Sequence, residues 1–152
     1  MSGTFLHSLD EKSRVTIPAK LRDALTEHFW MTLDSNNNIA LYSDAMWQKV
    51  LQHCQRMMAE NSHDDAIAAA VERIVSFADE VIVENPSWRI PINEVLRERA
   101  QLQKDVVTVG VIDHAVMWAK EKYEAQMVAR LDHEEVRKKQ AALLRAAATE
   151  QG

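Results

Sequence analysis

The chain has 152 residues, which fits one ordinary domain or two small domains that share a core. Its 47% hydrophobic and 27% charged residues are typical of a folded globular protein and exclude general disorder. No segment approaches the roughly 18 apolar residues of a membrane span, and the N-terminus lacks a basic, apolar leader. Cys54 is the only cysteine, which excludes an intrachain disulfide. We therefore expect a cytoplasmic protein with no membrane partner.

The formal net charge of -5 argues at first against a nucleic-acid partner, because phosphates are neutralised by clustered Lys and Arg. The charge is unevenly distributed, however. Residues 43–84 carry three basic and eight acidic side chains, whereas residues 7–25 carry four against three and residues 85–104 four against two. A symmetric oligomer could gather the two basic segments on one face, so the net charge does not exclude DNA binding.

The first part of the chain predicts a short strand, a short helix and a β-hairpin. Arg14–Ile17 has strand character, and Pro18 suits the first position of a helix, which we place at Ala19–Leu25. Phe29–Leu33 and Ile39–Tyr42 are strand-like runs. The polar residues between them include three asparagines, which tolerate the positive φ of a tight turn, so we expect a hairpin.

Two helices are predicted after the hairpin. Ser43 or Asp44 caps the first helix, and its apolar residues form one stripe at helical spacing: Trp47, Val50, Leu51, Cys54, Met57 and Met58. A break at Asn61–His63 precedes the second helix, whose apolar face contains Ile67, Val71, Ile74, Val75 and Ala78. We expect an antiparallel helix pair that links two β-containing segments.

The second part of the chain repeats the order strand, short helix, hairpin and helix. It predicts strands at 81–83 and 88–92, a helix that begins after Asn93 and ends at Ala100, a hairpin of 105–112 with 115–118, and a helix over 120–130. The Ala-rich, charge-dense segment 134–149 is either a helix or a frayed tail.

An internal repeat relates the two halves. Placing residues 10–25 over residues 85–100 without a gap matches Arg14 with Arg89, Val15 with Ile90, Ile17 with Ile92, Leu21 with Leu96 and Arg22 with Arg97. One inserted residue later, Tyr42 matches Trp118 and Trp47 matches Tyr123. This self-similarity predicts two copies of one supersecondary unit, packed about a pseudo-two-fold axis.

The segment His7–Arg22 resembles the opening module of the MraZ family, whose signature runs Asp-x-Lys-Gly-Arg-φ-x-φ-Pro (φ apolar) and leads into a helix. Leu102–Val111 and Met117–Trp118 resemble the strand region of the second module, and the likeness covers residues 4–128. The resemblance implies an α+β fold of two AbrB-like modules, each a swapped hairpin or barrel. It places the first module with its trailing helix at 1–58, the second with its leading helix at 59–128, and a helical tail at 129–152.

The resemblance also implies a function. Members of this family are transcriptional regulators encoded with cell-division and cell-wall genes; they assemble into rings and bind short direct repeats at their own promoter. Two Asp-x-x-x-Arg motifs supply the DNA-contacting loops. The first is intact here as Asp10–Arg14, whereas the second, Asn85–Arg89, keeps the arginine but lacks the aspartate. Ser13 and Trp88 stand where the family has glycine, so a positive φ there would cost about 1 kcal/mol and alter the loops.

The chemistry of these residue types suits a DNA backbone and its bases. Lys12 and Arg14 lie two apart and point to the same side of an extended segment, where both could meet phosphates, and arginine can also bond guanine through two donors. Asp10 would orient Arg14. The resemblance places the DNA-binding set at Asp10, Lys12, Ser13, Arg14, Lys20, Arg22, Arg89 and Arg97. From spacing alone, a surface ion pair between Asp10 and Arg14 is the simpler explanation of the loop, and solvated helix faces are the simpler explanation of the helix charges, which include Arg99. Trp88 could equally cap a strand pair.

No motif for catalysis or metal binding is evident. The six histidines lack metal-ligand spacing, and the three glycines form no phosphate loop. We expect a non-enzymatic, nucleoid-associated transcriptional repressor without a cofactor, a metal or a small-molecule substrate, acting as a ring-like homo-oligomer on double-stranded promoter DNA. Two alternatives remain: an oligomeric scaffold that has lost DNA binding, and a small enzyme in which His53, Cys54 or His114 converge.

Overall fold

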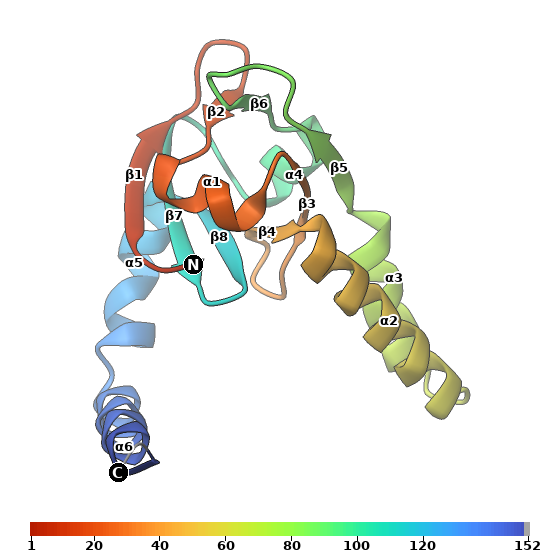
Figure 1. The fold of residues 1–152 in the computed structure, drawn as a ribbon, viewed down its shortest axis with the longest axis vertical. Helices are drawn as coiled ribbons and strands as arrows, with labels where there is room; N and C mark the ends of the chain where they lie inside the picture. Colours follow the sequence, from red (N-terminus) through yellow and green to blue (C-terminus); the bar gives the residue numbers. More distant parts are fainter. Residues whose placement is uncertain (151–152) are drawn as a thin grey trace. The chain divides into compact units, whose positions relative to one another are not determined.

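The computed structural model describes residues 1–150 and forms two compact units: Met1–Ala119, and a helical unit that begins at Lys120. The first unit contains all of the described strands (Figure 1). No helix among residues 1–150 is long and apolar enough to cross a membrane. The module boundaries expected from the sequence, after residues 58 and 128, remain predictions.

The main sheet has six strands, each antiparallel to its neighbours. Their order across the sheet is β1 (Thr4–Ser8), β7 (Asp105–Val111), β8 (His114–Ala119), β4 (Ile39–Ser43), β3 (His28–Leu33) and β5 (Asp79–Ile82). The two predicted hairpins, β3–β4 and β7–β8, lie next to each other at its centre. Each is flanked by a strand from the other half of the chain, which is the swapped arrangement that the family resemblance implies.

A second, two-stranded sheet joins β2 (Arg14–Thr16) to β6 (Arg89–Pro91). Val15 lies directly opposite Ile90, which is its equivalent in the repeat, so the two-fold axis passes through this pair. The short helices α1 (Ala19–Leu25) and α4 (Glu94–Arg99) follow these strands. Pro18 lies at the N-cap of α1, one position before the helical position predicted for it, and the side chain of Asn93 accepts the Leu96 amide to cap α4, as predicted.

Backbone conformation repeats along with the strands. Six non-glycine residues of the described range 1–150 have positive φ, and they form three pairs that are each 75 residues apart: Ser13 with Trp88, Thr26 with Gln101, and Asn37 with Ile112. The strand order is likewise unchanged when β1, β7 and β8 are exchanged for β5, β3 and β4. The structure therefore confirms two modules about a pseudo-two-fold axis. The barrel alternative is wrong, because the main sheet is open and ends at β1 and β5.

Both modules contribute to a single hydrophobic core. Its fully buried side chains include Val15 and Ile17 from the first module, Ile90 and Leu96 from the second, and Phe29 from the sheet. Burial of such side chains contributes about 1.5–3 kcal/mol each relative to exposure. Because the two modules share this core, they are bound to each other by packing as well as by strand exchange.

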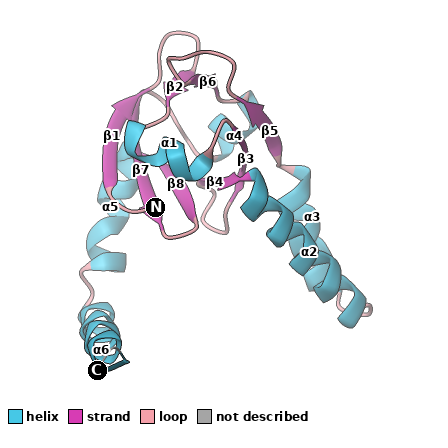
Figure 2. Cartoon of the chain, in the orientation of Figure 1, coloured by secondary structure: helices cyan, strands magenta, loops and turns pink. Residues whose placement is uncertain are grey.

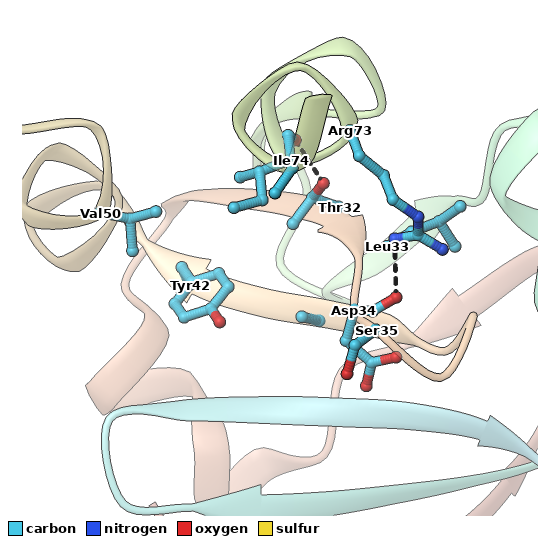
Figure 3. Close-up of a pocket in the computed structure, with 10 residues that line it drawn as sticks. Thr32, Leu33, Asp34, Ser35, Tyr42, Val50, Arg73 and Ile74 are labelled. Atoms are coloured by element: carbon cyan, nitrogen blue, oxygen red, sulfur yellow. Dashed lines mark hydrogen bonds between the residues drawn. The ribbon is translucent and has the colours of Figure 1, made fainter. Parts of the chain in front are cut away.

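The predicted helix pair is α2 (Asp44–Glu60) and α3 (Asp65–Ser76), capped by Ser43 and Asp64 (Figure 2). Trp47 of α2 is buried and stacks on Trp30 of β3. Much of the expected apolar stripe is nevertheless uncovered, because only Trp47 and Cys54 of α2, and no residue of α3, are fully buried. The pair leaves a hollow of about 380 Å³ against the sheet, which Leu33, Tyr42, Val50, Arg73 and Ile74 help to line (Figure 3).

The helical unit consists of α5 (Lys120–Leu131) and α6 (Glu134–Glu150). The segment left open as a helix or a frayed tail is therefore helical. Neither helix has a fully buried side chain, and Val128, Leu143 and Leu144 are strongly exposed.

Candidate nucleic-acid interface

The segments Asp10–Arg14 and Asn85–Arg89 form neighbouring loops at one end of the first unit, at the top of Figure 1. The β2–β6 pairing places them together, since each loop leads into one of these strands. Two further backbone bonds, related by the two-fold axis, connect the loops to the opposite module: Ile17 N–H donates to the Trp88 carbonyl (2.9 Å) and Ile92 N–H to the Ser13 carbonyl (3.1 Å). The loops are thus positioned by the core rather than by their own sequences alone.

Asp10 organises the first loop. Its Oδ1 accepts the backbone N–H groups of Lys12 and Arg14, both at 2.9 Å, and its Oδ2 accepts Nε–H of Arg14 at 2.9 Å. The side chain thereby fixes both the turn and the direction of the guanidinium group. Ser13 completes the turn with a φ of 56°. The predicted orientation of Arg14 by Asp10 is therefore present in the structure.

Asn85 takes the corresponding place in the second loop. Its Oδ1 accepts the N–H of Arg89 at 3.4 Å and the hydroxyl of Ser87, while its Nδ2 donates to the Arg89 carbonyl at 3.2 Å. Trp88 has the same φ as Ser13, 56°. The second loop thus retains a hydrogen-bonded turn without a carboxylate, and what it lacks is the negative charge that would hold its own arginine.

Arg89 instead approaches the carboxylate of the other loop, with its terminal nitrogen 3.8 Å from Oδ2 of Asp10. One carboxylate therefore faces two arginines. Hydrogen bonds from Arg14, then from the Lys12 backbone, hold the pKa of Asp10 below its usual value, so Asp10 is ionised at neutral pH. This contact across the axis was missed by the sequence analysis, which treated the two loops separately.

Cationic donors remain available around this carboxylate. Arg14 bonds Asp10 through Nε, and within residues 1–150 its two terminal nitrogens are in no hydrogen bond. Lys12 is exposed, and its ammonium has no ion-pair partner in this part of the chain. A shallow hollow of about 230 Å³ is lined by Asp10, Glu11, Lys12, Arg14 and Arg89. The structure thus brings together the three loop cations that the sequence singled out.

The helix cations are placed differently. Arg22 is committed to packing: its Nε–H donates to the Ile17 carbonyl at 3.0 Å and its guanidinium lies 5.6 Å from the centre of the Trp88 ring. Trp88 is half-buried and packs against the core. Lys20 is exposed beside β1, whereas Arg97, the equivalent of Arg22, is half-buried on α4. Arg99 lies over the ring of Phe77.

The residues of the enzyme alternative are not brought together. Cys54 is buried in α2, His53 is exposed and bonded to Arg56, and His114 stacks on Tyr42 beside Asp113. Within residues 1–150, no group of three potential metal-binding side chains is close enough to hold an ion.

Comparison with known proteins assigns this architecture. A family model described as "MraZ protein, putative antitoxin-like" matches residues 1–70 and 86–146. The chain belongs to the MraZ family. Three relatives, each named transcriptional regulator MraZ, illustrate the match. That of Clostridium tetani is 30% identical over 141 residues (93% of this chain, 96% of the relative), that of Natranaerobius thermophilus 38% over 123 (80% and 82%), and that of Neisseria meningitidis serogroup A 28% over 129 (82% and 83%).

Membership confirms the resemblance proposed from His7–Arg22. The relatives are regulators of transcription by name and not members of an enzyme class, so the family supports a role in transcriptional regulation for this chain. The second stretch matched by the family model begins at residue 86, inside the altered loop.

Proposed function

We propose that this protein is a sequence-specific DNA-binding repressor whose two loops, Asp10–Arg14 and Asn85–Arg89, contact the DNA. The observation that carries the proposal is the meeting of Lys12, Arg14 and Arg89 in one hollow at one end of the unit, with Asp10 bonded to Arg14 and close to Arg89. Three cations there face the two carboxylates of Asp10 and Glu11, and Asp10 holds the Arg14 guanidinium in one direction. A fixed arginine fork suits bidentate recognition of guanine, and the flanking charges suit phosphate contacts that set the register.

One chain offers only a small basic surface on a protein of net charge -5. We infer that self-association, in a ring-like homo-oligomer, aligns several such surfaces with short tandem repeats in a promoter, in the gene's own division and cell-wall cluster. Linked weak contacts then gain affinity through effective concentration, and occupancy of the promoter represses transcription in the nucleoid. Within this proposal, modules 1–58 and 59–128 each supply one loop and the segment 129–152 supplies a helical tail. Lys20, Arg22, Ser13 and Arg97 complete the predicted surface.

The two loops should contribute unequally. Arg14→Ala removes the arginine that a carboxylate holds in place, so specific binding should be lost in a gel-shift assay with the upstream repeats. Arg89→Ala should reduce binding less, because Arg89 has no carboxylate in its own loop. Arg56→Ala is the matched control, since Arg56 is exposed on α2, away from both loops, and bonds to His53 of the same helix. Equal losses for Arg14 and Arg89 would contradict this ranking.

Salt dependence separates specific loop contacts from general attraction. Each lost phosphate contact should lower the slope of log affinity against log salt by about one, whereas a lost base contact should mainly relax sequence preference. Lys12→Ala should therefore weaken binding to all sequences alike, while Arg14→Ala should also remove the difference between repeat and scrambled DNA.

A second candidate function is an oligomeric scaffold with reduced DNA binding. The missing carboxylate of the second loop and the acidic residues of 43–84 favour it. Elution from heparin tests it: wild type and Arg14→Ala should differ if the loops bind polyanions, and should elute together if the protein is a scaffold only.

A further inference from the structure

The main sheet ends in two strands with free outer edges, β1 and β5. Successive residues of an edge strand direct their backbone groups alternately toward the neighbouring strand and away from it. On β1, bonds from Gly110 to Gly3 (2.9 Å) and from Leu9 to Lys104 (2.8 Å) set the phase. The N–H and C=O groups of Leu6 therefore point away from β7. The bond from Val83 to Glu27 (2.7 Å) likewise shows that the backbone groups of Ile82 point away from β3.

Both edges carry a protruding aliphatic side chain. Leu6 is 65% exposed and Ile82 is 60% exposed. Successive side chains of a strand point to opposite faces of the sheet. Phe5 and Val81 pack on the core side, so the next residues, Leu6 and Ile82, project from the opposite face. Proteins usually protect an edge with charged side chains or proline within the strand, or by covering it. Strand β1 has no Asp, Glu, Lys, Arg or Pro, and β5 has only acidic charges, so these edges are open to a partner strand that does not repel the acidic one.

The two edges differ in charge. Asp79 and Glu80 make β5 acidic, whereas β1 has no charged residue and forms one wall of a groove of about 610 Å³ whose other wall includes the exposed Lys20. Pairing β5 with β5 of another copy would bring four carboxylates together, which is unfavourable. Pairing β5 with β1 instead places one of the carboxylates, that of Asp79, on the side of the sheet where the groove contains Lys20.

Strand direction permits the same pairing. Because six strands alternate in direction, β1 and β5 run in opposite senses. A second copy in the same orientation therefore presents its β5 antiparallel to β1 and continues the sheet, with Leu6 and Ile82 on the same face. Such a head-to-tail contact uses a different surface on each partner and extends into a ring or a filament.

From these observations we infer that copies of this chain associate by antiparallel addition of β5 of one copy to β1 of the next. The occupant of the β1 edge is thus a second copy of the chain. This inference rests on the self-association in the proposed function and names the surface responsible for it.

Proline substitution tests the inference without disturbing the sheet itself. Leu6→Pro and Ile82→Pro each remove an N–H that points outward, so neither takes a bond from the internal ladder. By sedimentation velocity, wild type should form species larger than a dimer and each variant should be monomeric. A 1:1 mixture should form dimers, because one variant keeps a working β5 and the other a working β1. Ile112→Ala, which removes a side chain that is 84% exposed in a turn, should keep the wild-type mass.

Several results would overturn the inference: wild-type mass in either proline variant, a homodimer of either variant alone, or a mixture that stays monomeric. If circular dichroism shows that a proline variant is unfolded, two charge-reversal variants test the inference in its place. Asp79→Lys and Lys20→Glu should each reduce association, and mixing them should restore it by opposing their new charges, because Asp79 lies on the same side of the sheet as Val81 and the groove. Failure of the mixture to exceed the separate variants would contradict β5–β1 pairing.

Single-repeat DNA separates this inference from the DNA-binding proposal. Leu6→Pro should still bind a duplex with one repeat at low salt but lose the advantage of tandem repeats. A wild-type protein that assembles through these edges yet binds no DNA would refute the proposed function and leave the edge pairing intact.

Discussion

Arg89 approaches Asp10 across the pseudo-two-fold axis, with 3.8 Å between its terminal nitrogen and the carboxylate. The reciprocal contact cannot form, because the second loop has Asn85 in place of an aspartate. Asp10 therefore supports two arginines, one in each loop. A change at this residue should affect both loops, whereas a change at Asn85 should affect only one.

Asp10→Asn should make the protein less stable at neutral pH and indistinguishable from wild type in acid. The amide oxygen can still accept backbone N–H groups of the turn, as Asn85 Oδ1 accepts the Arg89 N–H, but the charge that attracts Arg14 and Arg89 is lost. Because hydrogen bonds lower the folded-state pKa of Asp10, its stabilising contribution is present above the unfolded-state pKa and is lost as pH falls through the lowered value. Urea unfolding of both proteins at a series of pH values from 7 downward measures this, and a difference that does not narrow as pH falls below the unfolded-state pKa would contradict it.

Ser13→Gly should stabilise the protein. At a φ of 56° the backbone of Ser13 is in the left-handed region, where a Cβ atom costs roughly 1–2 kcal/mol. Glycine removes this cost, but it also gives the unfolded chain more conformational freedom, which offsets part of the gain. We expect the free energy of unfolding to rise by about 0.5–1 kcal/mol. Thermal unfolding by calorimetry checks it, and a lower midpoint would show that Ser13 makes a contact that outweighs the strain.

Trp88→Gly should have the opposite sign, although Trp88 has the same φ. Its ring packs on the core and lies beneath Arg22, so glycine would relieve the backbone but remove a half-buried aromatic surface. The net loss should be about 2 kcal/mol. Measuring it beside Ser13→Gly separates backbone strain from packing, and equal effects at the two positions would show that the ring contributes little.

Much of this fold was predictable from local patterns. Apolar periodicity located both hairpins and the helix pair, and the match of Arg14 with Arg89 predicted the symmetry that Val15 and Ile90 display. The strand β1 was missed for a physical reason. Thr4–Ser8 has only two side chains directed at the core, Phe5 and His7, and both are half-buried. Its strand conformation depends on pairing with β7, a hundred residues away, which no local pattern contains.

The site was predictable in its residues but not in its connections. The motif identified Asp10, Lys12, Arg14 and Arg89, whereas the ion pair across the axis and the stacking of Arg22 on Trp88 depend on tertiary packing. Residue type alone assigned Arg22 and Lys20 the same role. Burial distinguishes them, because Arg22 is held against the core and Lys20 is exposed.

His7 should make the protein less stable as pH falls below neutrality. Its ring lies between β1 and the core, with Nε2 2.6 Å from the hydroxyl of the fully buried Thr108. Burial is the largest influence on this group and lowers its pKa from the ordinary value of 6.5. The unfolded chain therefore takes up a proton at a higher pH than the folded chain, so stability is lost as pH falls from about 6.5 toward the lowered value. His7→Gln keeps a hydrogen-bonding side chain that does not titrate, and urea unfolding of both proteins at pH 7.5 and pH 5 isolates the effect from the other histidines. Wild type should lose more stability than the variant between these two pH values, and equal losses would show that protonation of His7 is not coupled to folding.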